Sequence, residues 1–75
     1  MPKLPIINSR QMVGVLKKFG FVELRHKSSS HLMLKHPDGR WTIVPIHGGR
    51  DIPKGTLKSI LKATDISLED LIKNL

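Results

Sequence analysis

The stretch HLMLKHPDGRWTIVPI, residues 31–46, decides the fold of this chain. Two runs rich in apolar residues, 31–36 and 41–46, flank the turn sequence PDGR (37–40). An Asp-Gly pair between two such runs predicts a hairpin, because glycine readily adopts the positive φ that tight turns need. Pro45 cannot donate a ladder hydrogen bond, so we expect the second strand to lie at a sheet edge or to end there.

A third strand and a helix are predicted on the N-terminal side of this hairpin. Residues 21–26 alternate in polarity and precede the polar loop 27–30, and a simple closure of that loop sets His26 opposite His31. Before them, Asn8 or Ser9 can cap a helix that Gly20 ends. The apolar residues at helical spacing in that helix are Met12, Val13, Leu16 and Phe19. Residues 1–7, with two prolines, read as an extended lead-in.

Two helices are predicted after the hairpin. The first starts near Pro53 and buries an apolar face formed by Leu57, Ile60 and Leu61. The second is short and opens at Ser67, which with Asp70 resembles a capping box. The chain is therefore predicted to be α+β: a helix, a three-stranded antiparallel sheet, a helix and a short C-terminal helix.

Length and composition narrow the function classes. At 75 residues the chain forms one domain, and a domain this small buries only about 60% of its unfolded surface, which leaves little room for an internal cofactor. It has no cysteine, and therefore neither a disulfide framework nor a thiolate metal site. No apolar run approaches a membrane span, and the N-terminus lacks the apolar segment of a signal peptide. We expect a cytoplasmic protein with no membrane contact and no cofactor.

The charge is high and unevenly distributed. The formal net charge is +7. Residues 1–62 carry 12 Lys and Arg against 3 acidic residues, which is net +9, whereas residues 63–75 carry one Lys against 3 acidic residues, which is net −2. A basic body with a mildly acidic tail favours a polyanionic partner, and nucleic acid is the preferred one. Charge kept only for solubility is the alternative.

His31 is the preferred candidate for chemistry. Histidine is the side chain best suited to proton transfer near neutral pH, and this one stands where a small polar loop becomes a strand. Lys27 and Lys35 are candidates to hold a phosphate, and Ser29 and Ser30 leave room for an RNA backbone to approach. A single histidine after serines is also an ordinary surface pattern.

The remaining polar residues are either candidates for phosphate binding or residues interpreted as structural. Arg50, Lys54 and Lys58 surround the start of the predicted second helix, whose free N–H groups favour an anion, with Lys62 ranked lower. A solvated outer face explains the same lysines equally simply. His36 is interpreted as a solvated strand end and His47 as a loop residue. Trp41 either stacks on a base or, more commonly for a lone strand tryptophan, packs in the structure.

Several motifs together resemble one family, the HicA toxins of bacterial toxin–antitoxin pairs. The most specific motifs are VPIH (44–47) and IPKGTLKSIL (52–61). They are accompanied by Gly20-Phe21, Ser30-His31 and the turn region 36–40. The resemblance extends from about Ser9 to Leu75. The family usually has a glycine within two residues before its catalytic histidine, where this chain has three serines, 28–30.

The resemblance implies both fold and function. It implies an α-β-β-β-α fold like that of double-stranded-RNA-binding domains, and one HicA-like RNA-cleaving domain over residues 1–75. It implies an mRNA interferase: an endoribonuclease that cleaves mRNA, with its catalytic histidine at His31. It also implies a HicB-like antitoxin that masks the active site, with operator DNA contacted only through that antitoxin.

Three hypotheses follow from residues and resemblance together. The preferred one is a metal-independent endoribonuclease in which His31 is the general acid or base. Its RNA-binding residues are Lys27, Ser29, Ser30, Lys35, Arg50, Lys54 and Lys58. The second is a non-catalytic RNA-binding module of the same fold, in which His31 only contacts phosphate. The third is a metal-dependent nuclease that uses several histidines, although no strong zinc motif is present.

Overall fold

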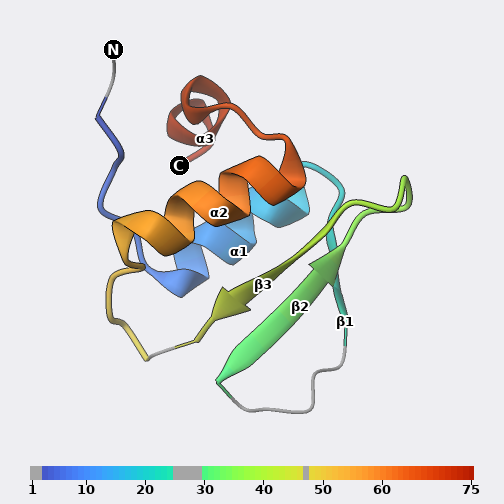
Figure 1. Ribbon diagram of the computed structural model, residues 1–75, viewed down its shortest axis with the longest axis horizontal. Coiled ribbons are helices and arrows are strands. Elements are labelled where there is room, and N and C mark those ends of the chain that lie inside the picture. Colours follow the sequence, from blue (N-terminus) through green and yellow to red (C-terminus); the bar gives the residue numbers. More distant parts are fainter. Residues whose placement is uncertain (1–2, 25–29, 47) are drawn as a thin grey trace.

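The chain folds as a helix, a three-stranded antiparallel sheet, a second helix and a short third helix (Figure 1). The computed structural model describes residues 3–24, 30–46 and 48–75. Its elements are α1 Ser9–Lys18, β1 Val22–Leu24, β2 His31–Lys35, β3 Trp41–Pro45, α2 Lys54–Thr64 and α3 Leu68–Lys73. The predicted α+β class and element order are therefore confirmed. Within the described residues, no helix is both long and apolar enough to cross a membrane.

β2 is the central strand of the sheet. The strand order is β1-β2-β3 and both pairings are antiparallel. Leu34 of β2 lies opposite Glu23 on one side and Thr42 on the other. The β1–β2 register is the one predicted from a simple closure of the 27–30 loop, because Val22 pairs with Lys35 and Leu24 with Met33. The predicted pairing of His26 with His31 lies outside the described residues, because residues 25–29 and 47 are not described.

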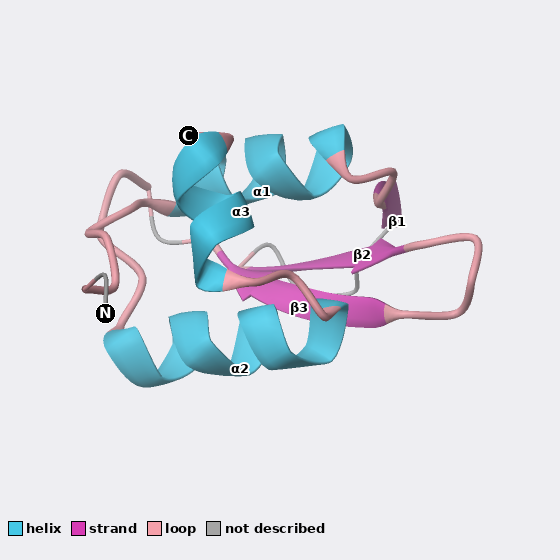
Figure 2. Ribbon diagram, turned by 90° about the horizontal axis from the view of Figure 1, so that it is seen from above, coloured by secondary structure: helices cyan, strands magenta, loops and turns pink. Residues whose placement is uncertain are grey.

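Helices α1 and α2 cover one face of the sheet, and α3 lies above them (Figures 1 and 2). Leu34 and Val44 are fully buried beneath the helices. They belong to one core cluster that also contains Met12, Leu16, Leu57, Ile60 and Leu71. Because side chains alternate across a strand, the odd-numbered residues of β2 and β3 project from the opposite, open face of the sheet.

α1 begins and ends where local chemistry predicts. Asn8 accepts a hydrogen bond from the Gln11 N–H at 2.9 Å, and Gln11 accepts one from the Asn8 N–H at 2.9 Å. This reciprocal pair is a capping box that satisfies two backbone donors at the helix start. Gly20 follows the helix with φ +91°, a conformation that few other residues adopt.

The N-terminal segment is tied to the loop before α2. Ile7 is buried, and its carbonyl accepts a hydrogen bond from the Ile52 N–H at 2.8 Å. An isolated bridge joins Asn8 and Asp51 beside it. Sequence reasoning predicted an extended lead-in but not this contact, which joins residues more than 40 positions apart.

His36 is not the solvated strand end that the sequence suggested. Its ring is half-buried and meets Phe21 edge to face, with centroids 5.1 Å apart. Its Nδ1 accepts a hydrogen bond from the Asp38 N–H at 3.1 Å. The guanidinium carbon of Arg40 lies 5.2 Å from the Phe21 centroid. The prediction was wrong because Gly20 brings Phe21 beneath the hairpin turn, a contact that sequence spacing does not reveal.

The hairpin turn is held by Asp38 and Arg40. Gly39 has φ +101°, as the Asp-Gly pair predicted. Asp38 accepts hydrogen bonds from the Arg40 N–H at 3.0 Å and from its Nε at 2.8 Å. The Arg40 backbone N–H, with its guanidinium, lowers the pKa of Asp38 below its usual value. Arg40 also donates to the Thr64 carbonyl, which joins the turn to the end of α2.

Two glycines should respond oppositely to alanine. A Cβ on Gly20 would lie 3.1 Å from His36 Nε2 at a positive φ, whereas a Cβ on Gly14 would have nothing within 4 Å. We expect Gly20→Ala to destabilise the fold by more than about 1 kcal/mol and Gly14→Ala to stabilise it by about 0.5–1 kcal/mol. Urea unfolding of both variants measures this. Equal shifts in the same direction would contradict the described contact between Gly20 and His36.

Asp38→Asn should lower stability in a pH-dependent way. A carboxyl whose pKa is lowered on folding stabilises the folded state above its unfolded pKa, and this contribution is lost as the pH falls through the folded pKa. The variant should therefore be less stable than the native chain at neutral pH, and the difference should shrink progressively as the pH falls below about 4. Thermal unfolding between pH 7 and pH 3 tests this. A difference that stays constant with pH would count against the ionic contact.

Candidate active site

His31 lies at the start of the central strand, on the open face of the sheet. It is the first residue of β2 and pairs with Pro45, the last residue of β3. Three positions further along, Leu34 points into the core, so the alternation of the strand directs His31 away from the helices. The side chain is exposed. The structure therefore presents an imidazole to solvent at the end of a rigid, paired strand.

Ser30 orients this imidazole. The Ser30 Oγ lies 3.1 Å from His31 Nδ1, within hydrogen-bond distance. The carbonyl of Ser30 accepts a hydrogen bond from the Ile46 N–H at 2.7 Å, which anchors the serine backbone to the end of β3. The serine hydroxyl can either donate to Nδ1 or accept from it, and in both cases the contact leaves the other ring nitrogen available. In this arrangement the available nitrogen is Nε2.

The serine run departs from the expected glycine without requiring a glycine-like backbone at Ser30. Among the described residues, Asp65 is the only non-glycine with a positive φ, so Ser30 does not occupy the left-handed region. Ser29 and Lys27, two of the predicted RNA-binding residues, lie outside the described residues.

Lys35 shares the open face with His31 but stands at the other end of β2. The two residues are four positions apart on one strand, which corresponds to about 13 Å between their Cα atoms. Lys35 is exposed and pairs with Trp41. This spacing favours contact with a different phosphate from the one at His31.

The other predicted cations lie in the helix layer. Arg50 is in the loop before α2, and Lys54 and Lys58 are exposed on α2 itself. Since α2 covers the face of the sheet opposite His31 (Figure 2), the structure does not gather these lysines around the imidazole. α2 begins at Lys54, after Pro53, and no side chain of the described residues caps its first N–H groups.

Lys54 and Lys58 instead border a groove between α2 and the N-terminal segment. The groove is about 860 Å³. Its lining combines apolar and cationic side chains: Lys3, Leu4, Ile6, Lys54, Lys58, Leu61 and Leu68. Sequence reasoning missed this groove, because it depends on the contact of Ile7 with the loop before α2.

The open face carries apolar residues that sequence reasoning did not assign. Trp41 is 50% exposed and Ile43 is 40% exposed on β3, and Val22 is 57% exposed on β1. Trp41 therefore lies outside the buried core, and its two interpretations, base stacking and packing, both stay predictions. Strict alternation around Val44 was the signal that could have placed Trp41 and Ile43 on the open face.

No metal-ligand cluster is found in the described part of the chain. Within residues 3–24, 30–46 and 48–75, no group of three or more His, Asp or Glu side chains is arranged to hold a metal ion. His26 and His47, which a multi-histidine site would require, lie outside these residues.

Comparison with known proteins adds one finding to this geometry. The family model described as "HicA toxin of bacterial toxin-antitoxin" matches residues 9–66, which is most of the chain. The matched segment begins at the first residue of α1 and ends just after α2. A comparison with curated proteins finds no match.

Proposed function

The chain belongs to the HicA family of toxins of bacterial toxin–antitoxin systems, and we propose that it acts there as a metal-independent endoribonuclease that cleaves mRNA and inhibits translation. The observation that carries this proposal is the exposed His31 imidazole, held by Ser30 at Nδ1 on the open sheet face. The net charge of +7 supports a polyanionic substrate.

His31 would transfer protons during attack of a ribose 2′-OH on the adjacent phosphate. As general base, Nε2 accepts the 2′-OH proton while the 2′ oxygen bonds to phosphorus. The bond to the 5′ oxygen then breaks and that oxygen takes up a proton, leaving a 2′,3′-cyclic phosphate. One positioned imidazole supplies about 10²- to 10⁴-fold of rate enhancement. Cationic stabilisation of the phosphorane must supply more, and Lys27, four residues before His31 in the sequence, is the candidate for it.

Arg50, Lys54 and Lys58 would bind the RNA away from the scissile phosphate. They lie in the helix layer, near the uncapped start of α2. Lysine side chains and the N–H groups of a helix N-terminus both favour phosphate. An RNA strand that reaches His31 and these residues would pass around the end of the sheet where β3 leads into α2.

A non-catalytic RNA-binding module is the second candidate. The separation of Lys54 and Lys58 from His31 favours this second candidate, because cations that only bind phosphates need not lie close to one imidazole. In this alternative, His31 contributes a phosphate contact and RNA remains intact.

The toxin family implies an antitoxin partner. We propose that this partner is HicB-like and masks the face that carries His31. Contact with operator DNA would then occur only through the antitoxin.

His31→Ala should abolish RNA cleavage by removing the proton-transfer group. We expect the cleavage rate of purified protein to fall by about 10²- to 10⁴-fold, while His36→Gln, which alters a histidine that packs on Phe21, retains activity if folded. RNA with 2′-deoxy substitution should resist cleavage, and EDTA should have no effect. Binding without cleavage would support the non-catalytic module, and loss of cleavage in EDTA would support a metal-dependent nuclease.

The double variant Lys54→Ala and Lys58→Ala should bind RNA more weakly, and its binding should depend less on salt. Each lost phosphate contact on a single strand reduces the slope of log K against log salt by about 0.7. Fluorescence anisotropy with uncleavable 2′-deoxy RNA at several salt concentrations measures the slope. Thr56→Ala combined with Ser59→Ala, on the other side of α2, is the matched control. Equal slopes in the lysine variant and the native chain would show that neither lysine contacts an RNA phosphate.

A further inference from the structure

β3 has a free edge with outward-facing backbone groups. In the described part of the chain no strand pairs with β3 on the side away from β2. The Ile46 N–H donates to Ser30 and the Arg40 carbonyl accepts from His36. Bonding alternates along an antiparallel strand, so the even-numbered residues 40–46 bond to β2. The N–H and C=O groups of Trp41 and Ile43 therefore face the free edge.

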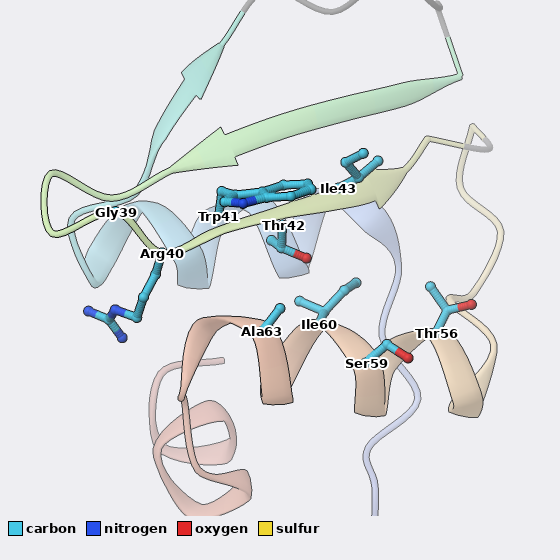
Figure 3. A pocket seen from close by; sticks show the side chains of 9 residues that line it. All are labelled: Gly39, Arg40, Trp41, Thr42, Ile43, Thr56, Ser59, Ile60 and Ala63. Atoms are coloured by element: carbon cyan, nitrogen blue, oxygen red, sulfur yellow. The ribbon is translucent and has the colours of Figure 1, made fainter.

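A groove runs along this edge between β3 and α2. Its volume is about 540 Å³. Figure 3 shows the side chains that line it. Thr42 points from β3 toward α2, and Ile60 rises toward β3 from the helix (Figure 3). The side chains of α2 along the groove are small at Ser59 and Ala63. The helix therefore leaves space beside the strand for another backbone.

The described lining of the groove offers little free positive charge for a nucleic acid. The chain has 13 Lys and Arg, but among the described residues Arg40 is the only one of them in the lining. Its guanidinium is already bound to Asp38 and to the Thr64 carbonyl. Lys54 and Lys58 of α2 line the other groove, the one beside the N-terminal segment. The chemistry of the β3 groove suits an uncharged polypeptide segment.

We propose that an extended segment of the antitoxin adds to the free edge of β3 as a fourth strand. The family assignment supplies the partner, and the inference rests on that partner and not on RNA cleavage. The N–H groups of Trp41 and Ile43 would donate to the added strand, which gives affinity through main-chain bonds. Small or apolar side chains at alternate positions would enter the groove above Ser59 and Ala63.

The proposal also explains how the partner reaches His31. An added strand extends the sheet, and its outward residues continue the apolar open face formed by Val22, Trp41 and Ile43. His31 lies on that face, opposite Pro45 at the end of β3. Pro45 has no N–H, so the run of donors ends there and the added segment is short.

Ile43→Pro tests the edge directly, with Ile43→Val as the matched control. Proline at residue 43 removes an outward donor and no bond to β2, and Pro45 already occupies the equivalent position two residues later. We expect Ile43→Pro to weaken binding of the chain's own purified antitoxin at least tenfold and Ile43→Val to change it less than twofold. Ser59→Arg should obstruct the groove and weaken binding similarly, whereas Lys58→Arg should not. Native-like binding by folded Ile43→Pro and Ser59→Arg would overturn the proposal.

Hydrogen exchange of the native chain keeps the proposal testable if a variant fails to fold. The Trp41 and Ile43 amides should exchange at least tenfold more slowly with the antitoxin bound. Unchanged exchange would overturn the proposal. Protection of these amides by uncleavable 2′-deoxy RNA alone would also overturn it, because the edge would then be a nucleic-acid site. Protection that rises with the concentration of the chain alone would overturn it too, because it would indicate pairing of two copies. Antitoxin binding is measured without RNA, so failure of the ribonuclease proposal would appear separately, in the cleavage assay.

Discussion

Burial of Leu34 in the central strand is the constraint on which the rest of the structure depends. Leu34 has no exposed surface and pairs with both neighbouring strands. Because the side-chain period of a strand is two residues, this burial directs His31 to the open face. A slip of one residue would turn the imidazole toward the helices and expose the core leucine. The position of the proposed catalytic group is thus set by a hydrophobic residue three positions away.

The short helix α2 presents two chemically different surfaces. Lys54 and Lys58 border the groove beside the N-terminal segment, whereas Ser59 and Ala63 line the groove beside β3. Between these two surfaces lies the buried face of α2, which includes Leu57 and packs against the core. Residues three or four apart share a helix face, so eleven residues suffice to present cations on one side and small side chains on the other. This division would let the proposed RNA and antitoxin contacts use different chemistry on the same helix.

Local signals in the sequence predicted most of the fold. Asn8 as a cap, Gly39 in the turn and the apolar spacing of α2 each act within a few residues, so the sequence carries them directly. What it could not predict are contacts between distant segments. The pairing of Ile7 with Ile52 and the packing of His36 on Phe21 arise only after the elements assemble. For the same reason the sequence identified Lys54 and Lys58 as surface cations but not their separation from His31.

The open face of the sheet breaks the usual rule for a sheet covered on one side. Such a sheet normally presents polar residues to water on its uncovered face, yet here Val22, Trp41 and Ile43 remain exposed. The net charge of +7 opposes self-association of these residues in the free chain. Departures from local patterning concentrate at functional surfaces. An apolar face that ends at His31 is a surface through which the proposed antitoxin contact would remove the imidazole from solvent without any change in the fold.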